Sequence, residues 1–148
     1  MREKFSIRLI SINEIPEVTN WARLEGFSPG MDDVSIYRNT DKQGIWAACL
    51  DNNPIGSIAC IKYNSSYGFI GLFIVKQEFR NNGYGVRLWK HALEYLKNVD
   101  CIGLEAAPDR LNDYAKWGFR KSSITNRWKL NSSQDSVSYT HLRAHETQ

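Results

Sequence analysis

The sequence has 148 residues, of which 42% are hydrophobic and 24% are charged, and its formal net charge is +3. This length and balance are those of one globular domain with a single core. The small net charge gives no argument for a nucleic-acid partner, although it suits an anionic cofactor locally. No apolar run approaches the ~20 residues of a membrane span, and the N-terminus lacks an apolar signal core. We therefore predict a cytoplasmic protein with neither a membrane nor a nucleic-acid partner.

Three cysteines, Cys49, Cys60 and Cys101, lie in apolar, strand-like runs. An odd number without close spacing makes neither a disulfide framework nor a metal site. We expect three buried thiols in a reducing compartment, and no metal cofactor.

The N-terminal segment predicts a strand followed by a helix. Residues Phe5 to Ile10 alternate apolar and polar side chains, as in a strand. Ser11 and Glu14 have the spacing of a capping box, and Pro16 suits the first turn of a helix that stops at Gly26. The apolar positions of this helix are Ile15, Val18, Ala22 and Leu24.

The next segment predicts a short helix and three strands. Met31 to Tyr37 suits a second helix, with two acidic residues at its positive end. The strands are Ile45 to Leu50, Ile55 to Tyr63 and Tyr67 to Val75. Their links are short and rich in turn residues, which favours an antiparallel meander.

The hydrophobic period changes after Val75. An amphipathic helix is expected from Tyr84 to Leu96, because apolar residues recur there at helical spacing with charged residues opposite. Its apolar positions are Val86, Trp89, Leu93 and Leu96, and its polar positions are Arg87, Lys90, His91 and Glu94. A strand from Cys101 to Ala106, a helix from Pro108 to Trp117 and a strand after Gly118 complete the predicted order.

The turn between the last meander strand and the helix, residues 80–85, reads Arg-Asn-Asn-Gly-Tyr-Gly. Glycine and asparagine tolerate positive φ, so consecutive N–H groups can converge at the start of the helix. Such a cradle, at the positive end of the helix dipole, suits a phosphate or pyrophosphate. A plain helix entry with a glycine turn is the alternative.

The pattern Arg-x-x-Gly-x-Gly of residues 80–85, after a strand ending at Val75, resembles motif A of the GNAT superfamily of acyl-CoA-dependent N-acyltransferases. Residues 114–119, Tyr-Ala-Lys-Trp-Gly-Phe, resemble the family's Tyr-x-x-x-Gly-Phe and follow at the expected distance. The resemblance covers residues 5–130. It implies an α/β, GNAT-like fold over residues 1–130, with a mixed, mostly antiparallel central sheet flanked by helices.

The resemblance also implies an activity, the transfer of an acetyl group from acetyl-CoA to a primary amine of an unidentified acceptor. Pantetheine would pair with the backbone of Phe73, Ile74 and Val75, and the N–H of Val75 could polarise the thioester carbonyl. Pyrophosphate would lie on Arg80, Asn81, Asn82, Gly83, Tyr84 and Gly85. In relatives the tyrosine matching Tyr114 is the general acid for the leaving thiolate; the alternative is that its ring packs near Trp117.

The general base is less evident from the sequence. Glu105, at a strand end, is the best candidate, but an exposed strand-end carboxylate explains it equally. Glu25, Phe27 and Asp32 border the loop that faces the acceptor in relatives, and Glu25, Asp32 and the neighbouring Asp33 could hold a cationic amine there. Helix-dipole complementarity accounts for the two aspartates as well. His91 is expected to be a solvated side chain.

Residues 131–148 are polar, without periodicity, and are expected to be disordered. The stretch from Ser138 to Thr147 resembles translated sequencing adapter, so we expect a longer natural protein, with a C-terminal domain or as a homodimer. His141 and His145 in this stretch are not expected to bind metal. A non-catalytic acyl-CoA-binding or regulatory module is the rival to the enzyme.

Overall fold

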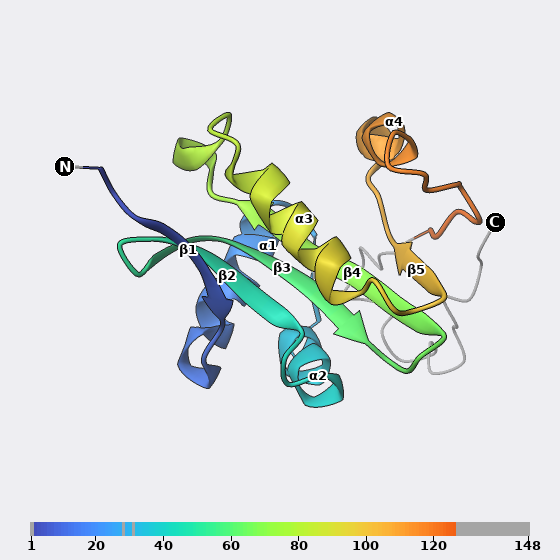
Figure 1. Cartoon of the computed structure of the whole chain (residues 1–148), viewed down its shortest axis with the longest axis horizontal. Helices are drawn as coiled ribbons and strands as arrows, with labels where there is room; N and C mark the ends of the chain where they lie inside the picture. The colour runs from blue at the N-terminus through green and yellow to red at the C-terminus, as the bar shows by residue number, and fades with distance from the viewer. Residues whose placement is uncertain (1, 28, 31, 127–148) are drawn as a thin grey trace, which may run out of the picture. The chain divides into compact units, whose positions relative to one another are not determined.

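The structure is a computed structural model that describes residues 2–27, 29–30 and 32–126. The chain divides into two compact units, Met1–Glu105 and Ala106–Gln148. The expected tail, with His141 and His145, lies outside the described residues. The first unit contains strands β1 (Phe5–Leu9), β2 (Ile45–Leu50), β3 (Asn53–Lys62), β4 (Tyr67–Val75) and β5 (Cys101–Leu104), and helices α1 (Ile15–Leu24), α2 (Asp33–Thr40) and α3 (Tyr84–Tyr95), as Figure 1 shows. The second contains a 3₁₀ turn, Pro108–Arg110, and α4 (Leu111–Ala115).

The five strands form one sheet in the order β1-β2-β3-β4-β5. The first four pair antiparallel, which confirms the predicted meander, whereas β5 is parallel to β4. A parallel pair needs a crossover connection, and α3 supplies it. The predicted mixed α/β class is confirmed.

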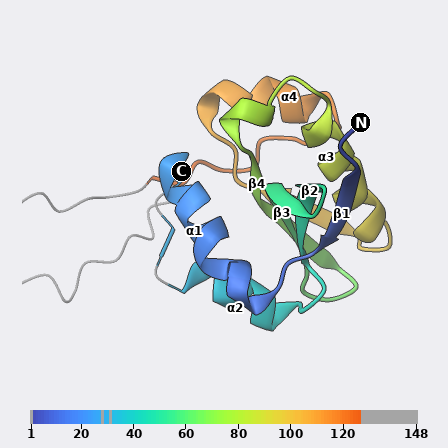
Figure 2. The ribbon, with the colours of Figure 1, turned by 90° about the vertical axis from the view of Figure 1, so that its left-hand side faces the viewer.

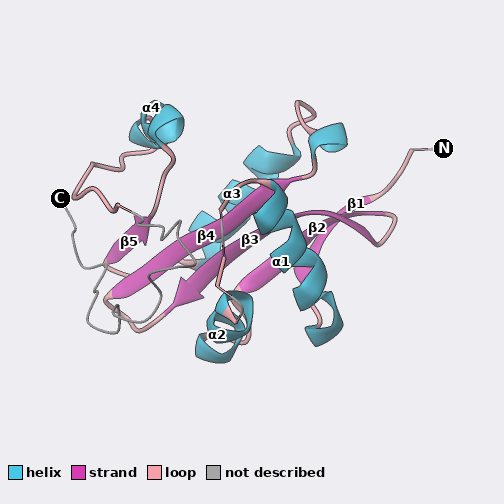
Figure 3. Ribbon diagram, turned by 180° about the vertical axis from the view of Figure 1, so that it is seen from behind, coloured by secondary structure: helices cyan, strands magenta, loops and turns pink. Residues whose placement is uncertain are grey.

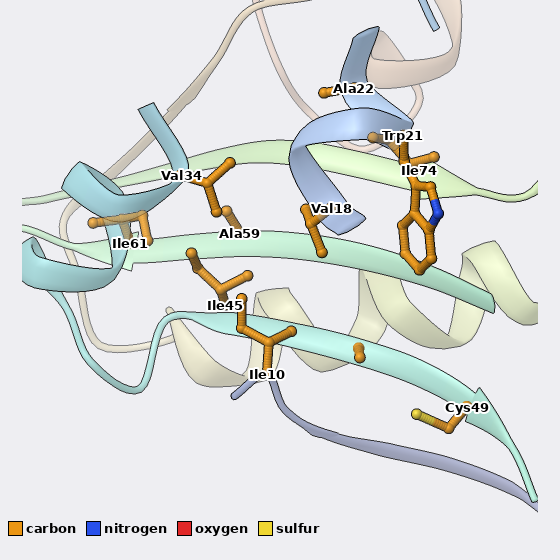
Figure 4. Packing of buried hydrophobic residues seen from close by; sticks show 11 residues of the cluster. Ile10, Val18, Trp21, Ala22, Val34, Ile45, Cys49, Ala59, Ile61 and Ile74 are labelled. Atoms are coloured by element: carbon orange, nitrogen blue, oxygen red, sulfur yellow. The ribbon is translucent and has the colours of Figure 1, made fainter. Parts of the chain in front are cut away.

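The sheet lies between α1 and α2 on one face and α3 on the other (Figure 2). Successive strand residues point to opposite faces, so each strand feeds two cores. The core under α1 and α2 consists of Ile10, Val18, Trp21, Ala22, Val34, Ile45, Ala47, Cys49, Ala59, Ile61 and Ile74, most of them labelled in Figure 4.

The face that α3 buries differs from the prediction. Trp89 and Leu96 are buried as expected, but Leu88 and Ala92 join them, and Val86 is 51% exposed. The buried face of α3 is therefore rotated about the helix axis relative to the predicted face. Glycine lets α3 approach the sheet, since a Cβ at Gly68 would lie 2.9 Å from the Leu96 Cδ2.

Other element predictions need smaller corrections. The first helix opens with a 3₁₀ turn at Ile12–Glu14, and Leu24 is exposed because the helix turns Trp21 toward the core instead. The strand expected to Ala106 ends at Leu104, and the predicted helix at Pro108–Trp117 is shorter, ending at Ala115. Between Gly118 and residue 126, the last described one, no extended strand forms.

Two of the three cysteines are buried as expected. Cys49 and Cys60 lie in the central strands, whereas Cys101 is exposed because it opens β5 at the edge of the sheet. All three are free thiols, and burial raises the pKa of Cys60 to about 12, which keeps this thiol protonated.

Glu14 fixes the entry to the first helix through two partners. Both of its carboxylate oxygens accept hydrogen bonds of 2.8 Å from the Arg8 guanidinium, and the N–H of Ser11 donates to Oε1 at 2.8 Å. The N–H to carboxylate bond is half of the predicted capping box. Mainly because of the Arg8 hydrogen bond, the pKa of Glu14 is lowered to about 2.

We expect Glu14→Gln to lower the free energy of unfolding at pH 7 by about 1–2 kcal/mol, a value reduced for the partial solvent exposure of the pair. Because the folded pKa lies below the unfolded one, this stability is present above about pH 5 and disappears as the pH falls toward 2. Urea unfolding at pH 7, 5 and 3 measures it. Glu17→Gln, an exposed change one turn away, is the control and should stay within about 0.5 kcal/mol of wild type. A Glu14→Gln deficit that did not shrink in acid would contradict the assignment.

Candidate functional site

Strand β4 carries a bulge in its second half. Ser57 of β3 is opposite Ile74 and Ala59 is opposite Gly71, so Leu72 and Phe73 together stand opposite one residue. Leu72 takes a φ of 49°, unusual for a branched side chain, and its carbonyl accepts a 2.7 Å hydrogen bond from the Ser57 hydroxyl. The bulge bends β4 away from a regular ladder.

Beyond the bulge, β4 has an open edge. Its pairs with β5 end at Ile70 and Leu104, while β4 continues to Val75 (Figure 3). The N–H of Lys76 donates to the carbonyl of Ile55 on β3. Because paired and unpaired positions alternate along an antiparallel ladder, the N–H and C=O of Val75 point away from β3, toward the open edge. A ligand with amide groups can pair with this edge as a strand would.

The turn after β4 has the predicted backbone. Asn81 and Gly83 take φ angles of 65° and 84°, and the amide of Asn82 donates to the carbonyls of Phe79 and Arg80, both at 3.1 Å. The helix α3 begins at Tyr84, with the N–H of Arg87 donating to the Gly83 carbonyl. The N–H groups of residues 84–86 therefore have no acceptor within the helix. This is the arrangement that binds phosphate groups at helix N-termini.

Gly85 joins this turn to the open edge. A Cβ added there would lie 3.6 Å from the Phe73 ring and 3.7 Å from Val75 Cγ2, so the first turn of α3 packs on the end of β4. The turn and the open edge thus form one continuous backbone surface, which we call the β4–α3 surface (residues 71–75 and 80–85).

The side chain of Tyr84 is used for anchoring. Its ring stacks on Phe5 of β1, with centroids 5.0 Å apart and planes 3° apart, and the Arg87 guanidinium lies 3.9 Å from the same Phe5 ring. The loop is held to the edge strand by these aromatic contacts, and Tyr84 presents its N–H to the turn.

Arg80 and Glu25 contact each other across the fold. The Arg80 Nε donates to the Val75 carbonyl at 2.7 Å, and its guanidinium forms an ion pair with the Glu25 carboxylate. Glu25 directly follows α1, so this pair ties the end of α1 to the turn before α3. The motif arginine and the expected acceptor-binding glutamate are neighbours, 55 residues apart in sequence.

The other expected acceptor residues lie around the α1–α2 connection. Phe27 is partly exposed, and its N–H donates to the Ala22 carbonyl. Asp32 is the N-cap of α2, and the neighbouring Asp33 accepts a 2.7 Å hydrogen bond from the N–H of Gly30. Both aspartates lie at the positive end of the α2 dipole, so helix-dipole complementarity accounts for their position as well.

Glu105 is the last residue of the first unit, and Tyr114 lies in the second. Glu105 is exposed and directly follows β5. Tyr114 lies in α4, and Gly118, in the turn after this helix, has a φ of 92°. The Tyr114 ring lies edge-on to Phe119, with ring centroids 6.3 Å apart. Burial raises the pKa of Tyr114, so its phenol is protonated at neutral pH.

The expectation for His91 was wrong. Its ring lies edge-on to Trp46 of β2, with centroids 4.3 Å apart, and Nε2 is buried without a hydrogen-bond partner among the described residues. Desolvation lowers its pKa. The helical pattern placed His91 on the polar face, but a large ring on β2 extends to meet it.

Neither a metal-binding cluster nor a membrane-spanning helix is present among the described residues. No group of three or more His, Cys, Asp or Glu side chains there is placed to hold a metal ion. Nor does any described helix have the length and hydropathy needed to cross a membrane.

The chain has clear relatives among known proteins. The model of the Acetyltransferase (GNAT) family matches residues 12–119. The chain belongs to the GNAT family. Over 117 residues this GNAT domain is 28% identical to holothin acyltransferase from Pseudoalteromonas sp. (strain SANK 73390), a match that covers 79% of the chain and 40% of that enzyme. The chain therefore spans less than half the length of this curated relative.

Solved structures share the fold of this GNAT domain. Ard1 from Thermoplasma volcanium superposes with a TM-score of 0.72 at 21% identity, covering 84% of this chain and 88% of Ard1. N-acetylglutamate synthase from Neisseria gonorrhoeae, solved with coenzyme A and L-arginine, gives a TM-score of 0.61 at 19% identity, covering 80% of this chain and 28% of the synthase. The five-stranded sheet flanked by helices is the GNAT architecture.

Proposed function

We propose that this GNAT domain is an N-acetyltransferase that moves an acetyl group from acetyl-CoA to a primary amine. One observation carries the proposal: the open edge of β4 leads directly into a turn at the start of α3, where the first N–H groups have no acceptor within the helix. A long amide-containing arm that ends in a pyrophosphate matches both parts of this surface.

The β4–α3 surface fits coenzyme A through backbone groups. In the proposal, Phe73, Ile74 and Val75 offer the strand edge to pantetheine, and the backbone of Arg80, Asn81, Asn82, Gly83, Tyr84 and Gly85 holds pyrophosphate. Arg80 adds a positive charge beside the turn. We propose that a phosphate oxygen replaces Glu25 as its partner, since both are anionic acceptors for a guanidinium.

Acetyl-CoA would supply a thioester whose carbonyl carbon an amine can attack. The chain has three tasks in that attack. An ammonium with a pKa of about 10.4 must lose a proton, and Glu105 is the proposed acceptor of that proton. The outward N–H of Val75 is proposed to stabilise negative charge on the thioester oxygen. The phenol of Tyr114 is proposed to give its proton to the leaving sulfur.

The acceptor is proposed to be a small molecule or a peptide that presents its amine near the α1–α2 connection. Glu25, Phe27 and Asp32 are the proposed contacts there. We further propose that residues 1–130 form the catalytic domain, that it acts in the cytoplasm, and that a homodimer or a C-terminal domain completes the protein.

A thiol-release assay with acetyl-CoA and a panel of amines, peptides and polyamines tests the activity. We expect thiol release that depends on the amine, together with coenzyme A binding by calorimetry. Binding without release would assign the chain to the rival class, a non-catalytic acyl-CoA-binding module. Absence of both would reject the proposed function.

A further inference from the structure

Arg80 is held at the end of β4 by a backbone contact. Its Nε donates a 2.7 Å hydrogen bond to the carbonyl of Val75, the last residue of the strand. A terminal nitrogen of the same guanidinium forms the ion pair with Glu25. Because the Nε bond holds the rigid, planar guanidinium on the strand, the cation can keep its place when its anionic partner changes. Arg80 is therefore a fixed positive charge beside the turn with an exchangeable partner.

The backbone of Glu25 is also anchored, so a change of partner involves only its side chain. Glu25 is the C-cap of α1. The N–H of Gly26 donates to the Arg23 carbonyl at 3.0 Å. The N–H of Phe27 donates to the Ala22 carbonyl, also at 3.0 Å. These two bonds, with Gly26 at a φ of 79°, form the Schellman ending of a helix, which is complete without the Glu25 side chain.

Helix α1 has its own attachment to the core. Val18, Trp21 and Ala22 are at most 7% exposed. At the same end of the helix, the Nζ of Lys76 lies 5.9 Å from the centre of the Trp21 ring. The Arg80–Glu25 pair is therefore not needed to hold α1 on the sheet. Its distinctive consequence is that it places a carboxylate on the arginine of the turn proposed to bind phosphate.

The pair is accessible to water and to a competing anion. The side chains of Arg80 and Glu25 are 37% and 33% exposed. An ion pair in contact with water contributes little to stability, because solvent and salt screen it and two long side chains lose freedom. A pyrophosphate on the turn carries more charge than one carboxylate and offers several acceptor oxygens to the same guanidinium. Pyrophosphate and Glu25 therefore compete for Arg80.

We propose that Glu25 is an internal competitor of the coenzyme: in the empty domain its carboxylate occupies Arg80 and lowers the affinity of the turn for phosphate groups. The inference rests on the proposed coenzyme site and adds its regulation. When pyrophosphate binds, it takes Arg80 and the Glu25 carboxylate turns out to water, while the Val75 carbonyl keeps the guanidinium in place. When the phosphate leaves, an anion of the chain replaces it, which favours release of coenzyme A after transfer.

Removing the carboxylate while keeping the shape of the side chain tests the competition. Calorimetry with coenzyme A and, separately, with inorganic pyrophosphate should show that Glu25→Gln binds both about three- to fivefold more tightly than the wild type, the size expected for a partly exposed ion pair. Glu78→Gln is the matched control, since it removes an equal charge near the turn from a residue that pairs with Lys76, and its affinity should stay within about 1.5-fold of wild type. In an Arg80→Gln background, which should bind more weakly, Glu25→Gln should give no further gain.

An affinity of Glu25→Gln equal to or below that of the wild type would overturn the proposal, because the pair would then only brace α1 or orient Arg80. A gain of equal size in Glu78→Gln, or one that persisted in the Arg80→Gln background, would overturn it too, since net charge would explain it. Urea curves check that the proteins compared are folded.

Failure of the proposed function gives a different result. Pyrophosphate binding with the expected pattern, but neither coenzyme A binding nor thiol release, would keep the internal competitor and reject the acetyltransferase. Binding of neither ligand by any of the variants or the wild type would reject both.

Discussion

Replacing Tyr114 by phenylalanine is expected to lower turnover by roughly 10- to 1,000-fold, the loss that follows removal of a positioned proton donor. The change removes the hydroxyl and keeps the ring that lies against Phe119. Because burial raises the pKa of Tyr114, the phenol holds its proton at neutral pH and is available to donate to the sulfur as the thiolate leaves. Steady-state thiol release measures turnover, and calorimetry with coenzyme A checks that cofactor binding is unchanged.

A second tyrosine gives a matched control for the loss of a hydroxyl. Tyr95 donates a 2.8 Å hydrogen bond to Asp41 at the end of α3, so Tyr95→Phe should lower the Tm while leaving turnover near wild type. Tyr114→Phe should show the reverse pattern. Wild-type turnover in Tyr114→Phe would remove this residue from the mechanism, and solvent would then be the proton source.

Local patterns in the sequence were sufficient to predict the strands and the turn that lead to the site. The bounds of β2 and β4 agree with the prediction, because each is an apolar run closed by turn residues. Positive φ at Asn81 and Gly83 also agrees with it, since asparagine and glycine are the residues that tolerate this conformation. The binding of phosphate at this turn stays a prediction.

Local sequence patterns could not predict contacts between segments that are far apart in the chain. The ion pair of Arg80 with Glu25 joins residues 55 positions apart and depends on where α1 ends above the sheet. The bulge places a leucine, Leu72, at positive φ, and nothing in the residue type marks it. The sequence pattern marks Tyr37 only as the end of a short helix, whereas its contact with Phe69 depends on where α2 packs against the sheet.

A substitution at Gly83 should affect both coenzyme A binding and backbone strain, and a second glycine allows the two effects to be separated. It sits in the left-handed region with a φ of 84°, and an added Cβ would meet nothing within 4 Å. Gly26, after α1, has a φ of 79° and equally open surroundings. Valine at either position would strain the backbone by a similar amount, about 1–3 kcal/mol. Only Gly83 belongs to the turn proposed to hold pyrophosphate. The two valine substitutions should therefore lower stability by similar amounts, but only the one at Gly83 changes the proposed ligand site.

We therefore expect Gly83→Val to weaken coenzyme A binding by about 10- to 100-fold, that is by about 1.4–2.8 kcal/mol, and Gly26→Val to leave it within about twofold. The reason is geometric: a β-branched residue pulls position 83 out of the left-handed region, which turns the adjacent N–H groups away from their common focus at the start of α3. Calorimetric titration of coenzyme A into both variants and the wild type, at a temperature where urea curves show all three folded, measures the difference. Equal coenzyme A affinity in all three proteins would place the pyrophosphate elsewhere, and an equal loss in both variants would mean that strain, rather than the turn, controls binding.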